Sequence, residues 1–217
     1  MKEQNLQSFW KAAYMSGSDT WTHLPYEKKA LSFLSSFPEE SLVLDIGSGR
    51  GTWLVSLARQ KFRVIGIDYI EEIVKKANEE LKERDISERA RFLVGDALDI
   101  PFVDTSFDIA TDIGLLQHLP RQDHTQYSRE VTRVVKNNGF FLLITLSDET
   151  KEWKGKYPKE QENKTINFFD IPYNFFSKED ILKLFPDFKI AKEDSLAIPC
   201  AGTPATYSLY LLQKVQS

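Results

Sequence analysis

The chain has 217 residues, with 28 Lys or Arg and 32 Asp or Glu, so its formal net charge is −4. A hydrophobic content of 41% and a charged content of 28% are those of a globular protein and exclude a disordered or fibrous chain. One Cys cannot form an intramolecular disulfide, and the acidic balance disfavours a protein that tracks nucleic-acid phosphates.

Membrane and export signals are absent from the sequence. Its longest apolar run, residues 140–146, is far shorter than the ~20 residues that span a bilayer. The polar start, residues 1–5, lacks the apolar stretch of a signal peptide. We therefore expect a cytoplasmic protein that has no membrane partner.

Residues 1–40 are rich in aromatic side chains at helical spacing. Trp10 and Tyr14 are four positions apart, so a helix presents them on one face, and Trp21 and His23 follow. We expect these residues to form an aromatic helical cover that closes over a ligand site. Packing of the same side chains as a purely structural cluster is the alternative.

From residue 41 onward, short apolar runs alternate with segments of helical period. The predicted strands are residues 41–46, 63–68, 90–94, 107–111 and 139–145. Apolar spacing predicts helices around 73–81 and 127–135, and the run Asn137-Asn138-Gly139 predicts the end of the second helix. Nearly continuous apolar strands separated by helices predict a doubly wound, mostly parallel α/β sheet over residues 41–146, with helices on both faces.

The last part of the chain, residues 147–217, differs in composition. Its charged stretch predicts a loop or mobile insert over 149–164, and an ordered lid over 147–165 is the alternative. A linker rich in Pro, Gly or Ser is absent, so we expect a single domain over 1–217.

Beyond this insert the pattern becomes regular again. Ser177 is placed to cap a short helix that Pro186 ends. Residues 188–194 and 205–215 alternate in polarity, as half-exposed strands do. They predict a terminal pair of antiparallel strands.

The strongest motif is the run Asp45-Ile46-Gly47-Ser48-Gly49-Arg50-Gly51-Thr52, where the first predicted strand meets the next helix. Glycines there let the backbone approach a ligand, and a helix N-terminus offers free N–H groups. A dinucleotide site requires G-x-G-x-x-G, whereas here the third glycine is misplaced and Asp45 would repel a pyrophosphate. That carboxylate suits a cationic ligand, with an amine or sulfonium centre. A plain glycine-rich turn is the alternative.

This run resembles motif I of the class I S-adenosylmethionine-dependent methyltransferases, and further pieces follow in that family's order over residues 40–146. The resemblance implies a seven-stranded Rossmann-like sheet whose last strand is antiparallel. It also implies that S-adenosyl-L-methionine is the cofactor. The loop would contribute Asp45, Gly47, Ser48 and Gly49 to its site.

Three further pieces of the sequence match family positions around the cofactor. Asp68 ends the second predicted strand, ~20 residues after the loop, where the resemblance implies an acid that binds the ribose hydroxyls. Tyr69 matches the position that packs on the adenine. The run Gly95-Asp96-Ala97 resembles the motif at the adenine edge, and Asp112 opens a segment that resembles the one beside the methyl group.

Ligands of such folds bind at the carboxyl ends of the strands. We therefore expect the carboxylates of four residues to face one cleft, namely Asp45, Asp68, Asp96 and Asp112. Trp10 and Tyr14 would close over the methionine end, as in the N-terminal cover of small-molecule methyltransferases of the thiopurine and tellurite-resistance types. Aromatic faces attract a sulfonium by cation–π interaction.

His118 is the candidate catalytic residue, because it follows the fourth predicted strand where acceptors lie in this family. General-base help is worth ~10²–10⁴-fold, but only for an acceptor that must lose a proton. A His that packs structurally or touches the cofactor is the alternative. His124 begins a predicted helix and is expected at the surface. No metal site is predicted.

Signatures that are missing from the sequence exclude some classes of methyl acceptor. The segment Thr111-Asp112-Ile113-Gly114 replaces the Asn/Asp-Pro-Pro-Tyr signature of amino-group methylation on bases or glutamine. The single Cys, Cys200, lies far downstream of the position that cytosine-C5 enzymes use for their nucleophile. We expect a small-molecule acceptor and no nucleic-acid partner, and the oligomeric state stays open.

Two functions from other classes compete with methyl transfer. A regulatory protein that binds the cofactor without catalysis would keep Asp45, Asp68 and Asp96. An NAD-dependent oxidoreductase shares the doubly wound sheet, but the misplaced third glycine and Asp45 disfavour it.

Overall fold

A computed structural model describes residues 3–19, 22, 26–150, 152, 161–162, 164–168, 171–200 and 203–215. Trp21, His23 and the greater part of the charged insert therefore lie outside the described residues, and so does the side chain of Cys200. In the part of the chain that is described, no helix is long and apolar enough to cross a bilayer.

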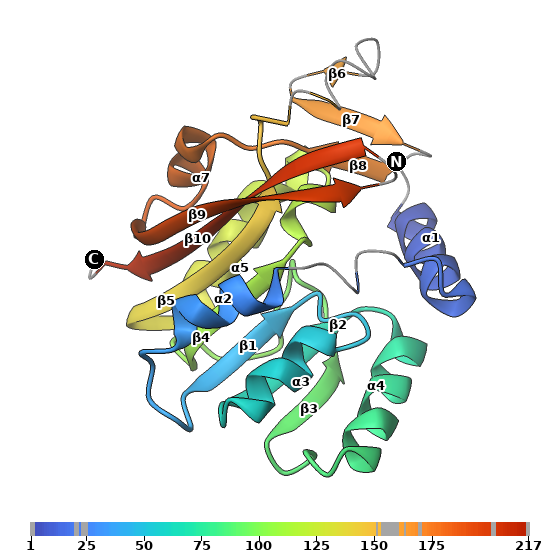
Figure 1. The fold of residues 1–217 in the computed structure, drawn as a ribbon, viewed down its shortest axis with the longest axis vertical. Helices are drawn as coiled ribbons and strands as arrows, with labels where there is room; N and C mark the ends of the chain where they lie inside the picture. The colour runs from blue at the N-terminus through green and yellow to red at the C-terminus, as the bar shows by residue number, and fades with distance from the viewer. Residues whose placement is uncertain are drawn as a thin grey trace.

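A seven-stranded sheet forms the centre of the molecule (Figure 1). Its strands are β1 (Leu42–Ile46), β2 (Arg63–Asp68), β3 (Ala90–Val94), β4 (Phe107–Ile113), β5 (Val135–Leu146), β9 (Phe188–Cys200) and β10 (Thr203–Lys214). Their order is β3-β2-β1-β4-β5-β10-β9. The last strand, β10, lies antiparallel to both neighbours, whereas β1 to β5 pair in parallel. The expected doubly wound sheet with an antiparallel last strand is confirmed.

Helices cover both faces of this sheet because successive strand residues point to opposite sides. The helices are α1 (Glu3–Ser16), α2 (Glu27–Leu34), α3 (Thr52–Arg59), α4 (Glu71–Glu83), α5 (His124–Val134) and α7 (Lys178–Leu184). Val43 of β1 packs with α2, α3 and α4 in one apolar core. Its neighbour Leu44 belongs to a second core with α5 and α7 on the other face. The alternation along one strand thus assigns α2, α3 and α4 to one layer and α5 and α7 to the other.

The first 40 residues divide into two helices with different tasks. Ala30, Phe33 and Leu34 of α2 are buried against the sheet, so this helix is part of the core and does not cover a site. In contrast, α1 lies at one side of the molecule, between a small second sheet and α4 (Figure 1). Only the first of the two helices has the position expected of a cover.

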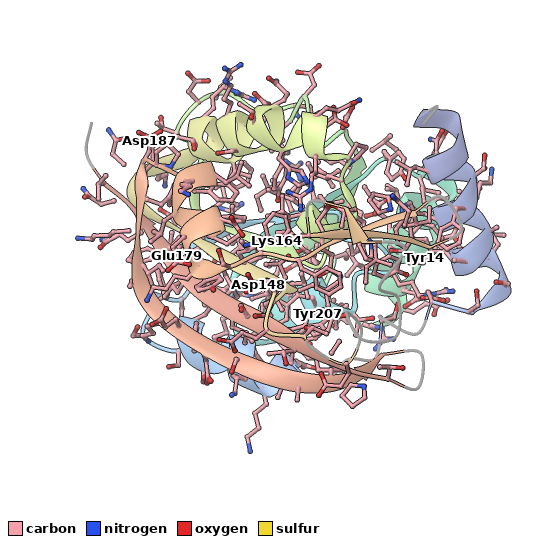
Figure 2. All side chains as sticks on the ribbon, turned by 90° about the horizontal axis from the view of Figure 1, so that it is seen from above. Tyr14, Asp148, Lys164, Glu179, Asp187 and Tyr207 are labelled. Atoms are coloured by element: carbon pink, nitrogen blue, oxygen red, sulfur yellow. The ribbon has the colours of Figure 1, made fainter. Side chains whose placement is uncertain are left out.

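The charged insert leads into a second sheet that sequence periodicity did not predict. Its strands are β6 (Gln161–Glu162), β7 (Thr165–Phe168) and β8 (Ile171–Asn174), and they pair antiparallel. Lys164 holds this sheet to the main body through ion pairs with Asp148 (3.0 Å) and Asp180 (2.6 Å), and the first pair is visible in Figure 2. Such short strands are stable only because other elements cover them.

Two local predictions near the ends of α5 and α7 have different outcomes. Ser177 forms a full capping box: its hydroxyl accepts from the Asp180 N–H at 3.2 Å, and the Asp180 carboxylate accepts from the Ser177 N–H at 2.8 Å. The prediction that Asn137, Asn138 and Gly139 end the other helix is wrong. That helix ends at Val134, and β5 starts directly afterwards. Asn138 takes a positive φ of 61° inside β5, where the pairing with β4 shifts register.

Candidate cofactor-binding and active site

A cavity of about 420 Å³ opens at the carboxyl ends of the strands, next to β1 and β4, where the strand order reverses. Sites of open α/β sheets lie at this kind of switch point. One end of the cavity is lined by residues that follow β1, β2 and β3, among them Gly47, Asp68 and Asp96. Ile113, at the end of β4, and Tyr207, on β10, line it from the other half of the sheet. The cavity therefore extends across the switch point.

The glycine loop forms one wall of the cavity because its backbone turns sharply. Gly47, Gly49 and Gly51 all have positive φ, which side chains with a Cβ rarely adopt. The N–H groups of Gly47 and Ser48 both donate to the Ile67 carbonyl at 2.9 Å, which ties the loop to β2. Gly47 lines the cavity, whereas a Cβ at Gly49 would lie 2.5 Å from the Tyr14 hydroxyl of α1. Both glycines leave room for a close approach, the first by the Leu115 side chain, 3.0 Å from an added Cβ, and the second by the covering helix.

The Ser48 side chain differs from its predicted placement. Its hydroxyl oxygen is buried, has no hydrogen-bond partner among the described residues and lies beside Gly66, where a Cβ would come within 2.8 Å of it. Ser48 is not among the residues that line the cavity. Its backbone, not its hydroxyl, shapes the loop.

Asp68 lies at the base of the cavity, where β2 ends. One carboxylate oxygen accepts from the Gly49 N–H at 2.9 Å and the other from the Ile70 N–H at 3.0 Å. Burial raises the pKa of this carboxyl, while these backbone N–H groups oppose the shift. Asp68 therefore holds the glycine loop in place in addition to facing the cavity.

The residues that the resemblance places at the adenine also reach the cavity. Asp96 and Ala97 line it after β3, and Tyr69 lines it after β2. The Asp96 carboxylate accepts from the Leu98 N–H at 2.8 Å, which fixes the turn, and the side chain stays exposed. The structure thus brings Tyr69, Asp96 and Ala97 to the same cavity as Asp68.

The other two acids do not face the cleft, which corrects the expectation that four carboxylates line it. Asp45 is 2% exposed and accepts a 2.8 Å hydrogen bond from the Thr111 hydroxyl. Asp112 is fully buried and accepts from the N–H groups of Leu115 and Leu116 and from the Tyr127 hydroxyl at 2.7–3.0 Å. Both acids brace the strand ends behind the cavity wall.

Burial raises the pKa of Asp45 to about 7. The hydrogen bond from Thr111 opposes this shift, and the nearby charge of Asp112 adds to it. Because the native state then holds the proton more tightly than the unfolded state, stability falls as pH rises from about 4 to about 7. We expect Asp45→Asn to remove this loss, of at most about 4 kcal/mol, while keeping an oxygen for Thr111. Urea unfolding of both proteins at pH 5 and pH 8 measures this pH dependence of the free energy of unfolding. Equal pH dependence in both proteins would contradict the assignment.

Helix α1 closes the cavity from outside. Trp10 and Tyr14 line it, and Figure 2 shows Tyr14 at this helix. Arg50 of the glycine loop pairs with Asp19 just beyond α1 and also donates to the Tyr14 carbonyl. Lys11 forms an ion pair with Glu72 at the start of α4. The helix is thus fastened to the same loops that shape the cavity.

His118 lines the cavity from a short 3₁₀ helix, η2 (Leu116–His118). Its Nδ1 lies 3.0 Å from the Pro172 carbonyl of β8, and its Nε2 lies 3.1 Å from the Gln117 side-chain nitrogen. Burial lowers the pKa of this imidazole to about 4. His118 is therefore neutral near pH 7.

The expectation that His124 lies at the surface is wrong. Its side chain is 6% exposed, its Nε2 lies 3.0 Å from the Leu119 carbonyl, and its ring packs near Phe176. The first turn of α5 faces the main body here, so its leading residue is buried.

Sequence reasoning missed several residues that line the cavity. Tyr26, Gln117, Ile144 and Tyr207 all reach it. Tyr26 precedes α2, and Tyr207 lies within an alternating strand, so neither differed from an ordinary core residue. Across the described residues, no group of three or more His, Cys, Asp or Glu is arranged to hold a metal ion.

The strand order and the position of the cavity at the switch point are those of a Rossmann-like α/β fold. Residues 43–139 match the family model described as a methyltransferase domain. In structure, the chain is similar to the 1,6-didemethyltoxoflavin-N1-methyltransferase of Burkholderia thailandensis, with a TM-score of 0.78 at 20% identity over 98% of this chain and 88% of that chain. That structure holds 1,6-didemethyltoxoflavin and S-adenosylhomocysteine. Residues 43–139 of this chain are thus similar to a methyltransferase domain, and the chain as a whole shares its fold with that methyltransferase structure.

Curated relatives match about half of this chain. The uncharacterized methyltransferase YcgJ of Bacillus subtilis is 38% identical over 105 residues, which are 48% of this chain and 40% of that protein. The demethylmenaquinone methyltransferase of Listeria welshimeri is 32% identical over 129 residues, which are 58% of this chain and 52% of that protein. This chain thus spans about half the length of these relatives or less.

Proposed function

We propose that this protein transfers a methyl group from S-adenosyl-L-methionine to a small-molecule acceptor. The observation that best supports this proposal is the position of Asp68. Its carboxylate faces the cavity and also accepts a hydrogen bond from the Gly49 N–H of the glycine loop. A buried carboxylate next to close-approach glycines suits a ligand that brings hydroxyl donors and a positive charge. Small-molecule substrates in the names of similar proteins support the acceptor class.

The proposed cofactor site uses the residues that line one end of the cavity. Asp68 would accept from the ribose hydroxyls, Tyr69 would pack on the adenine, and Asp96 with Ala97 would contact its edge. Gly47 would give the methionine part a backbone contact, with Trp10 and Tyr14 above it. Gly49 would act indirectly, by making room for Tyr14. Asp45, Ser48 and Asp112 would act indirectly, by holding the loop and the strand ends.

The sulfonium supplies an already activated methyl group, so the chain need not provide a covalent nucleophile. Its residues would position the acceptor and exclude water, and positioning alone can contribute ~7–11 kcal/mol. Ile113, Ile144 and Tyr207 form the part of the cavity away from Asp68 and Asp96, and we assign the acceptor to this part. Closure of α1 would shield both ligands from solvent.

We further propose that the whole chain works as one domain in the cytoplasm. Residues 1–40 supply the cover, although α2 serves the core, and residues 41–146 supply the cofactor site. Residues 147–217 add the insert, α7 and the antiparallel strands that carry Tyr207. Membrane and nucleic-acid partners are not part of this proposal.

Calorimetric titration separates the cofactor classes. We expect the purified protein to bind S-adenosylmethionine and S-adenosylhomocysteine and to give no heat with NAD. Tight binding of NAD without binding of either sulfur ligand would refute the proposal.

A second assay separates an enzyme from a cofactor-binding regulator. S-adenosylhomocysteine release is measured over a panel of aromatic amines, thiols, phenols and carboxylates, with acceptor-free protein as the background. Methylation of at least one member is expected. If a folded protein that binds the cofactor releases no S-adenosylhomocysteine above background with any member of the panel, the regulatory function would be favoured.

A further inference from the structure

His118 is held by a chain of hydrogen bonds that fixes which of its nitrogens carries the proton. The Gln117 side-chain oxygen accepts from the Leu146 N–H at 2.9 Å, so its amide nitrogen must point to His118 Nε2. That nitrogen can only donate, which makes Nε2 the acceptor. The hydrogen then lies on Nδ1, which donates to the Pro172 carbonyl at 3.0 Å. Both ring nitrogens are occupied by the protein itself.

The turn that carries His118 is fixed by the small second sheet. The buried Asn174 side chain of β8 donates to the carbonyls of Gln117 (3.0 Å) and Leu119 (2.8 Å), on either side of His118. Thr165 of β7 donates to the Asn174 oxygen at 2.7 Å, and Arg121 donates to that same hydroxyl at 2.7 Å. The position of the imidazole is therefore determined by residues about 50 positions away in the chain.

The imidazole is also the contact between this turn and the covering helix. Trp10 of α1 meets the His118 ring edge-on at 4.8 Å between centroids, and Tyr173 of β8 meets it at 4.7 Å. Edge-on ring pairs of this kind attract each other beyond the apolar area that they bury. One ring thus joins the helix that closes the cavity to the small sheet.

From this geometry we propose that His118 is a positioning residue, a neutral imidazole with its hydrogen on Nδ1, which docks α1 onto η2 and β8 and does not act as the general base. Its consequence for catalysis rests on the proposed function. If the acceptor must lose a proton during methyl transfer, that proton goes to solvent and not to His118. Opening of α1 for ligand exchange then requires the Trp10–His118 contact to break.

The tautomer is tested by nitrogen-15 NMR of the histidine rings, which requires neither ligand nor activity. The chain has three His, and comparison with His118→Gln assigns the signals. We expect a neutral ring with the hydrogen on Nδ1 throughout pH 6–8. A ring that gains charge in that range, or one with the hydrogen on Nε2, would overturn the proposal even if methyl transfer were established.

The docking role is tested by the dissociation rate of S-adenosylhomocysteine, followed by stopped-flow fluorescence. His118→Ala is expected to raise the rate roughly three- to tenfold, because it removes the ring contact with Trp10. Trp10→Ala also removes the indole above the methionine part, so its rate should rise at least as much. The double variant should be no faster than Trp10→Ala alone. His118→Phe keeps a ring and should stay within about twofold of the parent rate. Additive effects, or an equal loss with Phe and Ala, would refute the docking role.

His124→Gln is the matched control for this series. It removes a second imidazole next to η2, a buried one, which contacts the Leu119 carbonyl and Phe176 and not α1. Its dissociation rate should equal that of the parent protein. An increase as large as that of His118→Ala would mean that general loosening of the turn, and not the contact with Trp10, explains the effect. Failure of every variant and of the parent to bind the ligand would instead refute the proposed function.

Discussion

Replacing Gly51 by Ala is expected to lower the free energy of unfolding by about 2–5 kcal/mol. Gly51 precedes α3 at φ 75°, in the left-handed region, where an L-residue costs about 1–2 kcal/mol. In addition, a Cβ there would lie 1.9 Å from the Phe92 ring tip. Phe92 is 3% exposed, so it cannot swing away, and overpacking of this kind costs about 1–3 kcal/mol. Urea unfolding measures the sum.

Gly17→Ala is the matched control for this variant. Its φ is 72°, nearly the same as that of Gly51, but nothing lies within 4 Å of the added Cβ. The loss there should be the backbone cost alone, about 1–2 kcal/mol. Equal losses at the two sites would mean that Phe92 yields and that the motif glycine is required only for its backbone angle.

Asp68→Ala is expected to weaken the binding of S-adenosylmethionine by at least tenfold. Hydrogen bonds to a charged group are worth about 1.5–3 kcal/mol, and this carboxylate would accept from the ribose hydroxyls. Its loss also releases the Gly49 N–H, so the loop that borders the cavity becomes less fixed. Titration calorimetry measures the change, with thermal unfolding to verify that the variant is folded.

Two further variants separate these contributions. Asp68→Asn keeps a carbonyl oxygen for one N–H donor and should lose less affinity than Asp68→Ala. Asp104→Ala removes an exposed carboxylate that pairs with Arg133 and does not line the cavity, so its affinity should be unchanged. Unaltered affinity in folded Asp68→Ala would exclude this carboxylate from the cofactor site.

The strands and helices of the core could be predicted from the sequence because apolar runs and helical spacing depend only on residues close together in the chain. Apolar runs at 42–46, 63–68 and 107–113 became neighbouring strands, and helical spacing placed α4 correctly. The cap at Ser177 was predictable for the same reason, since its partners are three residues away. The small second sheet was not, because β6 to β8 have two to four residues each and depend on distant partners.

The candidate site shows the same division. Its glycines and Asp68 could be recognised because a backbone turn and a strand-end acid leave a mark in the sequence itself. The sequence likewise predicted the fold class, whereas the order of the strands came from the structure. The sequence treated Asp45, Asp68, Asp96 and Asp112 alike, since all four follow or end strands. Only tertiary packing separated them, because the cavity reaches two of these carboxylates, while buried donors enclose the other two.

His118 shows why the tertiary structure had to decide its role. An imidazole has the same ordinary pKa, near neutrality, wherever it stands in a sequence, and its position after β4 suggested a base. Its actual state depends on Gln117, held by the Leu146 backbone, and on Pro172, 54 residues away. The sequence by itself determined the fold, the glycine loop and the ligand class that suits them. Protonation, burial and the direction of each side chain were decided by long-range contacts, because desolvation and hydrogen bonding depend on neighbours that only folding brings together.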